Sequence, residues 1–240
     1  VMATILSHEG STPRTAGTKM IVRRGGDTIA TVGGGLVEGE VVKAAEEVFQ
    51  SRSAQVRFFD LTGTNVESMD LVCGGSLEIL VEFVEAAGDN LRIFSELASS
   101  RRERKRSLLI ADLGTEAKPP KQVNRCLFVE NARMCGNLDL PVPLAEAAGR
   151  GAYRDRYPVL VTYEDRRYLV EPSVLLGTAY LFGAGHVSQQ VAPLAKMVDF
   201  STVVIDDRSE FANRDRFPAA DAIRVISSFE HAFDGLDVDS

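Results

Sequence analysis

The stretch Thr178-Ala-Tyr-Leu-Phe-Gly-Ala-Gly-His-Val-Ser188, with Val203-Val-Ile-Asp-Asp207 close behind it, decides the fold of this chain. Its apolar run predicts a strand, its glycines predict a tight turn, and residues 189–198 predict a helix. The glycine spacing is that of G-x-G-x-x-G, with Ser188 in the third glycine place. The second apolar run predicts a parallel strand with Asp206 at its tip. The segment therefore predicts a Rossmann-like βαβ unit.

A unit of this kind binds a dinucleotide with its glycine turn and with an acid at the tip of the next strand. The candidates for binding NAD(P) in this way are Gly183, Gly185, His186 and Asp206. His186 has the alternative of capping or packing at the helix start, and Asp206 has that of forming a turn. Residues 222–226 predict one more strand, but no second βαβαβ half follows. We therefore expect a truncated Rossmann segment over residues 173–240, in a fragment of a longer polypeptide, with a sheet edge that needs pairing.

Three glycine-rich turns lie in the first third of the chain. They are Gly10-Ser11-Thr12-Pro13-Arg14, Gly33-Gly34-Gly35 and Cys73-Gly74-Gly75. Glycine allows positive φ angles and a close approach of the backbone to a ligand. The triple glycine precedes a predicted helix, where free backbone N–H groups can bind an anion. Arg14 and Lys19 add positive charge, and Cys73 adds a soft ligand. The pattern predicts a site for a ligand that is both anionic and thiophilic.

Each of these residues also has a structural interpretation. Cys73 follows an apolar run, and free cysteine is among the most buried residue types. Arg14 lies in a turn, where a solvated arginine is the usual outcome, and three glycines could serve only close strand–helix packing. Glu38, in the first turn of the predicted helix, would complement the helix dipole. Its charge would also repel an anion bound there.

Residues 89–172 predict a second α/β lobe that loosely repeats a first lobe at residues 1–88. In the first lobe we expect strands at 2–6, 19–22, 28–32, 56–61 and 77–84 and a helix at 36–49. In the second lobe we expect helices at 91–97 and 144–148, with strands at 108–113, 126–129, 159–163 and 167–170. A turn at residues 135–138 would match the triple glycine. The two lobes are therefore expected to be pseudo-symmetric.

Three further features of the second lobe have structural interpretations. Glu171-Pro172-Ser173 predicts its end, because proline lacks a backbone donor and breaks strand pairing. The basic run at residues 101–106 is more typical of a solvated helix end or linker than of a nucleic-acid site. Cys126 and Cys135 lack the glycine context of Cys73, and we expect them in the core.

Composition narrows the function classes. The 240 residues are 45% hydrophobic and 25% charged, as in an average soluble globular protein. The net charge of −7 argues against nucleic-acid binding. Three cysteines form no disulfide framework, which favours a reducing, cytoplasmic setting. No run approaches the roughly 20 apolar residues of a membrane helix.

The motifs of both ends together resemble one family. Glu9-Gly10-Ser11-Thr12-Pro13-Arg14, Gly17-Thr18-Lys19-Met20, Gly33-Gly34-Gly35-Leu36-Val37-Glu38 and Met69-Asp70-Leu71-Val72-Cys73-Gly74-Gly75 are similar to the XdhC/CoxI family of xanthine dehydrogenase accessory factors. Phe182-Gly183-Ala184-Gly185-His186-Val187, Val204-Ile205-Asp206-Asp207-Arg208 and Arg216-Phe217-Pro218 are similar to the Rossmann domain of the same family. The motifs occur in family order and span most of the chain.

The resemblance implies a maturation factor that need not be a catalyst. Such a protein binds molybdenum cofactor (molybdopterin), protects it, and assists its sulfuration and insertion into a xanthine dehydrogenase-type molybdenum hydroxylase. The residues that would hold the cofactor are Gly10, Ser11, Thr12, Arg14, Lys19, Gly33, Gly34, Gly35, Cys73, Gly74 and Gly75. Cys73 would contact the molybdenum or its sulfido group. The implied partners are the hydroxylase apoenzyme and a cysteine desulfurase.

Two other function classes stay open at this point. An NAD(P)-dependent oxidoreductase would explain the Rossmann segment, but it leaves the glycine turns and Cys73 without a role. A scaffold that binds only proteins would need no small-molecule site. The unpaired sheet edge and the pseudo-symmetric lobes also predict a homodimer.

Overall fold

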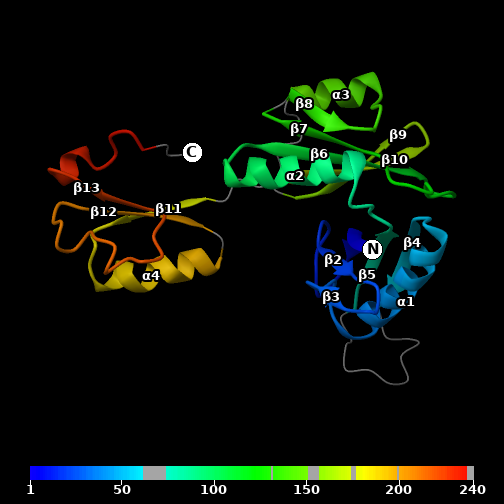
Figure 1. Cartoon of the computed structure of the whole chain (residues 1–240), viewed down its shortest axis with the longest axis horizontal. Helices are drawn as coiled ribbons and strands as arrows, with labels where there is room; N and C mark the ends of the chain where they lie inside the picture. Colours follow the sequence, from blue (N-terminus) through cyan, green and yellow to red (C-terminus); the bar gives the residue numbers. More distant parts are fainter. Residues whose placement is uncertain (62–73, 131, 151–156, 174–176, 199, 237–240) are drawn as a thin grey trace. The chain divides into compact units, whose positions relative to one another are not determined.

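The computed structural model describes residues 1–61, 74–130, 132–150, 157–173, 177–198 and 200–236 (Figure 1). The chain divides into two compact units, Val1–Val174 and Leu175–Ser240. Both combine helices with sheets, so the predicted α/β class is confirmed. No helix among the described residues is long and apolar enough to cross a lipid bilayer.

The first sheet of the first unit has the strand order β3-β2-β1-β5-β4, and its neighbouring strands run antiparallel. Its elements are β1 (Met2–Glu9), β2 (Lys19–Val22), β3 (Thr28–Ile29), α1 (Gly35–Ser51), β4 (Gln55–Asp60) and β5 (Ser76–Glu82). Helix α1 buries Val37, Val41, Ala44 and Val48 against one face of this sheet. Their helical spacing explains why this segment folds as an amphipathic helix. Strand β3 is shorter than the predicted 28–32, because Ala30 has a φ of 62° and ends the extended backbone.

The second sheet has the order β8-β7-β6-β10-β9. Its elements are β6 (Ser107–Thr115), β7 (Arg125–Val129), β8 (Ala132–Gly136), α3 (Val142–Gly149), β9 (Val159–Tyr163) and β10 (Arg166–Ser173), and α2 (Gly88–Arg102) joins the two sheets. Three strands, a helix and two strands follow one another in both sheets, with the same spatial order. Residues 135 and 136 differ from the predicted turn, because they belong to strand β8.

The prediction that Pro172 ends strand pairing was wrong, because β10 continues through it. Pro172 lies opposite Leu108 of β6, and the pairing of β10 with β6 continues to Ser173. On its other side β10 pairs with β9 only as far as Val170. Proline is tolerated where a strand has a free edge, since no neighbour there needs its missing N–H.

Among the described residues, the two sheets of the first unit contact each other through an apolar cluster and three ion pairs. The cluster joins Leu6, Ala54 and Leu80 to Ala111, Leu113, Val123 and Leu169. The ion pairs are Lys19–Glu171, Glu78–Arg167 and Glu82–Arg125. Alternate residues of β5 therefore face α1 and the second sheet, so that this strand is buried on both faces.

The second unit is a parallel sheet of order β11-β12-β13 with a helix against it (Figure 1). Its elements are β11 (Thr178–Phe182), α4 (His186–Met197), β12 (Ser201–Asp206), β13 (Ala222–Val225) and the short 3-10 helix η1 (Phe229–His231). Helix α4 begins three residues earlier than predicted, because Gly185 in an extended conformation is its N-cap. The strand–turn–helix–strand order is that of a Rossmann half, as the glycine spacing predicts.

Candidate functional site

The three glycine turns of the first unit meet at one end of its first sheet. A Cβ on Gly10 would lie 2.8 Å from the carbonyl oxygen of Gly74, and a Cβ on Gly75 would lie 2.3 Å from that of Glu9. A Cβ on Gly33 would lie 2.6 Å from Cγ of Pro13. The turn at residues 10–14 therefore touches both of the others. We call the turns at residues 10–14, 33–35 and 74–75 the glycine site.

Strand pairing explains this meeting. β1 pairs antiparallel with β5, and Glu9 lies opposite Ser76, so the end of one strand adjoins the start of the other. Gly74 and Gly75 extend the β4–β5 pairing, since the Gly74 N–H donates to Leu61 (3.1 Å) and the Leu61 N–H donates to Gly75 (2.8 Å). Close approach therefore requires glycine at position 75, where no positive φ is involved.

Arg14 is the available cation of the glycine site. Its side chain is exposed and has no ion pair or hydrogen-bond partner among the described residues. The Thr12 hydroxyl is not free in the same way, because it donates to the Arg14 carbonyl oxygen (2.9 Å). Ser11, next to it, is exposed. An anion at this turn would therefore meet a free guanidinium and the Ser11 hydroxyl.

Lys19 is placed differently from the sequence expectation. Its ammonium group pairs with Glu171 of β10 and is 3.5 Å from the Gly17 carbonyl oxygen. The Lys19 and Glu171 side chains are 29 and 14% exposed. Its charge thus contributes to the contact between the two sheets and is not free for a ligand.

The Glu38 carboxylate occupies backbone N–H groups that were predicted to bind an anion. Its Oε1 accepts a hydrogen bond from the Gly34 N–H (3.1 Å) and another from the Thr31 hydroxyl. The Thr31 oxygen in turn accepts the Gly33 N–H (3.0 Å). The N–H groups of both glycines are therefore already used, and a phosphate there would have to displace this carboxylate. The Glu38 carboxylate thus reaches back to the N–H of the N-cap residue Gly34, and sequence reasoning missed its contact with Thr31.

The cysteines divide into two groups. Cys73, the predicted soft ligand, lies outside the described residues. Cys126 is buried, and burial raises the pKa of its thiol to about 12. Cys135 is partly exposed, and burial also raises its pKa. The expected core position is confirmed for Cys126, whereas Cys135 lies only partly buried at the edge of an apolar cluster. Both are neutral thiols near pH 7.

In the second unit, the Asp206 carboxylate forms its hydrogen bonds with groups of the protein itself. Its side chain is fully buried and accepts hydrogen bonds from the Ala184 N–H (2.6 Å) and the Arg208 N–H (2.9 Å). The Arg208 guanidinium also bonds both carboxylate oxygens, at 3.0 and 3.1 Å, and these contacts hold the pKa of Asp206 well below its usual range. Asp206 therefore fastens the glycine turn to β12. Asp207, at 42% exposure, is the acid that faces solvent.

The other predicted dinucleotide-binding residues lie around the start of α4. Gly183 has a φ of 92°, and its carbonyl oxygen accepts the Ser188 hydroxyl (2.5 Å). His186 is exposed and forms no side-chain cap, since the cap is Gly185. Arg216, which the sequence showed as part of the family motif but to which it gave no site role, bonds the Gln189 side chain with its guanidinium (3.1 Å) beside this turn.

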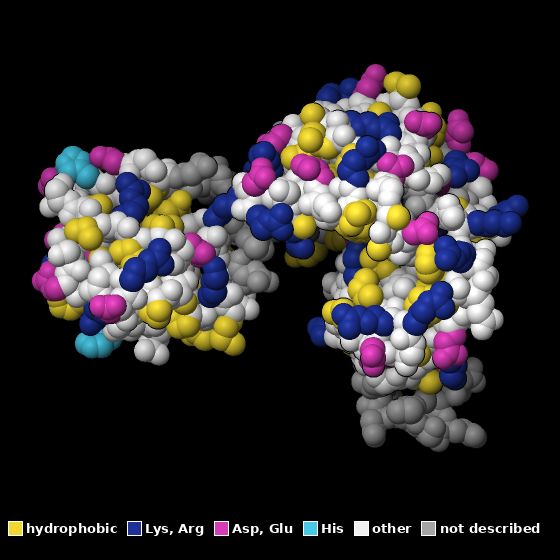
Figure 2. Space-filling model, in the orientation of Figure 1, with side chains coloured by type: hydrophobic (Ala, Val, Ile, Leu, Met, Phe, Trp, Pro, Cys, Tyr) yellow, Lys and Arg dark blue, Asp and Glu magenta, His cyan; other side chains and the backbone are white. Residues whose placement is uncertain are grey.

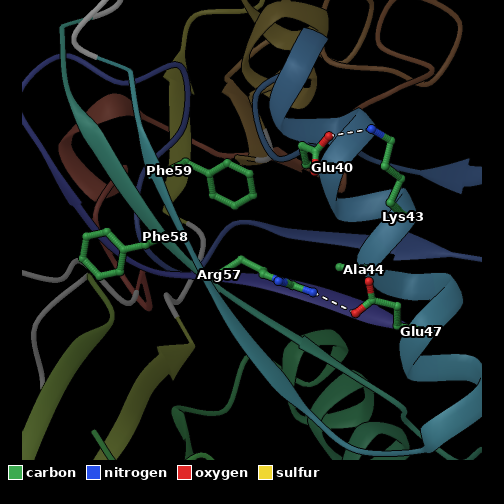
Figure 3. A pocket seen from close by; sticks show the side chains of 7 residues that line it. All are labelled: Glu40, Lys43, Ala44, Glu47, Arg57, Phe58 and Phe59. Atoms are coloured by element: carbon green, nitrogen blue, oxygen red, sulfur yellow. Dashed lines mark hydrogen bonds and ion pairs between the residues drawn. The ribbon is translucent and has the colours of Figure 1, made fainter. Parts of the chain in front are cut away.

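A surface hollow of about 380 Å³ lies between α1 and β4, away from the predicted residues (Figure 3). It is lined by Glu40, Lys43, Ala44, Glu47, Arg57, Phe58 and Phe59. Its charged groups satisfy one another, because Lys43 pairs with Glu40 (2.7 Å) and Arg57 with Glu47 (2.8 Å). None of the residues predicted for a ligand lines this hollow, so the glycine site is the stronger candidate.

Comparison with known proteins agrees with the motifs at both ends. The profile of the XdhC and CoxI family matches residues 1–60, and that of the XdhC Rossmann domain matches residues 179–238. The two matches together span half of the chain and contain two of the three glycine turns and the turn before α4. The chain belongs to the XdhC and CoxI family.

Relatives of this XdhC/CoxI chain include a protein from Bacillus subtilis (strain 168) that is described as a probable subunit of xanthine dehydrogenase. The two are 25% identical over 234 residues, which cover 95% of the chain and 65% of that relative. The uncharacterized protein YqeB of Escherichia coli (strain K12) is 30% identical over 80 residues, or 33% of the chain and 15% of YqeB. The chain thus spans less than two thirds of each relative.

A solved structure shares the fold of this family member. It is the crystal structure of a xanthine dehydrogenase from Bacillus halodurans, with a TM-score of 0.69 and 21% sequence identity. The match covers 97% of the chain and 65% of that protein. The likeness extends the fold assignment to nearly the whole chain.

Proposed function

We propose that the chain is an accessory protein that binds molybdenum cofactor in its glycine site and delivers it to a xanthine dehydrogenase-type molybdenum hydroxylase. The observation that carries this proposal is the contact between the three glycine turns, which are far apart in the sequence. Turns that meet through bare backbone leave room for a flat, anionic ligand to come close to the free Arg14 guanidinium and the Ser11 hydroxyl. The names of the relatives support the choice of a xanthine dehydrogenase as the recipient.

The glycine site offers different groups to the phosphate end and to the metal end of this cofactor. Arg14 would bind the phosphate, because a free guanidinium forms paired, charge-assisted hydrogen bonds with phosphate oxygens. Ser11 would add a hydroxyl donor. Lys19 takes no part, since Glu171 already neutralises it. Cys73 directly precedes Gly74 in the sequence, and a thiolate there would suit the soft metal end.

Glu38 limits where the anionic end can lie. Its carboxylate holds the Gly34 N–H, so the phosphate belongs on the Arg14 side of the site. When bound, the cofactor supplies the metal and dithiolene chemistry of the recipient enzyme, and the glycine site needs only to hold and shield it. We therefore assign a carrier role, with a cysteine desulfurase as the source of sulfur.

Anaerobic titration of the full chain with molybdenum cofactor tests the proposal. We expect near-stoichiometric binding by the wild type and at least about tenfold weaker binding by Arg14→Ala, the loss of one charge-assisted contact. Cys73→Ala tests the metal end in the same way. Arg102→Ala removes an exposed arginine from the last turn of α2 and is the matched control. Equal affinities for the wild type and Arg14→Ala would remove the glycine site from the proposal.

Titration with NADH and NADPH tests the rival oxidoreductase function. The specific observation in its favour is the glycine turn at the start of α4 in a parallel sheet. Against it stands Asp206, whose carboxylate is bonded within the protein and does not face a ribose. Binding of a nicotinamide nucleotide without any binding of molybdenum cofactor would replace the carrier function by the oxidoreductase.

A further inference from the structure

The Glu38 carboxylate has one oxygen that the described part of the chain does not use. Its Oε1 accepts the Gly34 N–H (3.1 Å) and the Thr31 hydroxyl, whereas no hydrogen bond or ion pair joins Oε2 to another described residue. An ionised carboxylate accepts about four hydrogen bonds, divided between its two oxygens. The Glu38 side chain is half-buried beside the glycine turns. Its Oε2 is therefore an acceptor that a ligand of the glycine site can use.

The position of this carboxylate is fixed before a ligand binds. Thr31 donates its hydroxyl hydrogen to Glu38, and the Thr31 oxygen accepts the Gly33 N–H (3.0 Å). The second anchor is the N–H of Gly34, the N-cap residue of α1. A ligand that bonds Oε2 does not have to order the side chain, and an acceptor held in place discriminates well between ligands.

The turn that anchors Glu38 adjoins the turn that carries Arg14. A Cβ on Gly33 would lie 2.6 Å from Cγ of Pro13, so these two turns are in contact. Arg14 follows Pro13 in the chain, and its guanidinium has no partner among the described residues. The glycine site therefore offers a cation on one turn and a hydrogen-bond acceptor at the next. These two groups suit a ligand with an anionic end and an N–H donor end.

A cation is the other possible partner of a carboxylate oxygen, and the surroundings of Glu38 do not favour one. Among the described residues, no group of three or more His, Cys, Asp and Glu side chains is arranged to hold a metal ion. Figure 2 shows Lys and Arg side chains interspersed with Asp and Glu on the described part of the first unit. A bound cation would also be repelled by the Arg14 guanidinium. A neutral N–H donor meets neither obstacle.

We propose that Glu38 binds the aminopyrimidinone edge of the pterin, accepting an amino N–H at Oε2, while Arg14 binds the phosphate at the other end of the ligand. This edge of the pterin carries an amino group beside a ring N–H, and a carboxylate accepts charge-assisted hydrogen bonds from such donors. Guanine has the same donor edge, so a guanine nucleotide shares this chemistry. The inference rests on the proposed cofactor-binding function and adds the residue that selects the pterin.

Calorimetric titration of the full chain with hydroxymethylpterin phosphate tests this contact without the metal. The matched probe is the corresponding lumazine phosphate, in which an oxo group replaces the amino group. A hydrogen bond to a charged group contributes about 10- to 100-fold in affinity, so the wild type should bind the pterin at least about tenfold more tightly than the lumazine. Guanosine monophosphate is the third probe, and tighter binding of it than of the pterin would overturn the pterin assignment.

The Glu38→Gln variant separates ligand selection from structure. The Gly34 N–H still needs an acceptor, so the amide oxygen replaces Oε1 and the amide NH2 group takes the place of Oε2. We expect pterin binding to weaken at least about tenfold and the preference over lumazine to disappear, because a donor now meets the amino group and suits the oxo group. Glu46→Gln is the control, since Glu46 is exposed on α1 and has no partner among the described residues.

The comparison of pterin with lumazine on the wild type needs no variant, so it stands even if Glu38→Gln fails to fold. Equal wild-type affinities for the two probes would overturn the inference. So would a folded Glu38→Gln protein that keeps the wild-type preference, or a wild type that binds the whole molybdenum cofactor but not the pterin phosphate. These results leave the carrier function intact, which fails only if the wild type does not bind molybdenum cofactor.

Discussion

Replacing Gly75 by alanine tests whether the glycine turns meet as described. The added Cβ would lie 2.3 Å from the carbonyl oxygen of Glu9, 2.6 Å from that of Ser11 and 2.8 Å from Cγ2 of Thr12. Optimal contacts of a carbon atom lie at about 3.5 Å or more, so the two main chains must separate by about 1 Å. Two of the three obstacles are backbone oxygens, so a change of side-chain rotamer cannot relieve the clash.

The expected cost follows from that displacement. Overpacking of this kind destabilises a protein by about 1–3 kcal/mol. In a domain of this size each kcal/mol lowers the melting temperature by about 2–4 °C, so the first unit should melt about 2–12 °C lower. Gly39→Ala is the matched control, since Gly39 lies within α1 and its Cβ would have no atom within 4 Å. That variant should be more stable than the wild type by up to about 1 kcal/mol.

Thermal unfolding followed by circular dichroism measures both variants, and cofactor titration of the Gly75→Ala protein measures the site. We expect weakened cofactor binding together with the lower melting temperature, because both depend on the same backbone contact. A Gly75→Ala protein that melts with the wild type would refute the close approach of the turns, and with it the geometric basis of the glycine site.

Three further outcomes are expected. Arg125→Ala should lower the free energy of unfolding by about 3–5 kcal/mol in urea, because it leaves the buried Glu82 carboxylate unpaired; a loss below about 1 kcal/mol would contradict this. The folded pKa of Asp206 is depressed, so its contribution to stability is complete above the unfolded value of about 3.9 and is lost as the pH falls through the folded value. Asp206→Asn should remove that part of the acid unfolding profile of the second unit, and an unchanged profile would speak against it. Cys126, with a pKa of about 12, should resist iodoacetamide at pH 8 until the chain unfolds, as mass spectrometry can show; rapid native labelling would exclude its burial.

Local patterns predicted most of the secondary structure. The bounds of β2 and β9 agree with the predicted residues 19–22 and 159–163, because apolar runs beside prolines, glycines or charges define short strands well. The shared strand order of the two sheets also agrees with the loose repeat seen in the sequence. One exception is β3, which the positive φ of Ala30 shortens. Another is α2, which begins three residues before and ends five residues after the predicted 91–97.

Long-range partners could not be predicted in the same way. Lys19 and Glu171 are 152 positions apart, and no local sequence pattern around either residue predicts their ion pair. The same holds for Asp206, since its buried position depends on how Ala184 and Arg208 close around it. The meeting of the glycine turns follows from the pairing of β1 with β5, which the sequence leaves open among several arrangements.

The ion pairs between the two sheets also bear on how the chain folds during synthesis. The first sheet is complete once β5 has been made, whereas Arg125 and Arg167 are added much later. Glu78 and Glu82 lie on the face of the first sheet that also carries Leu6 and Leu80 and that the second sheet covers. Exposed apolar surface makes folding intermediates aggregate, and carboxylates on it oppose that. The two carboxylates that are buried in the folded unit would therefore oppose aggregation of the first sheet before the second sheet has been synthesised.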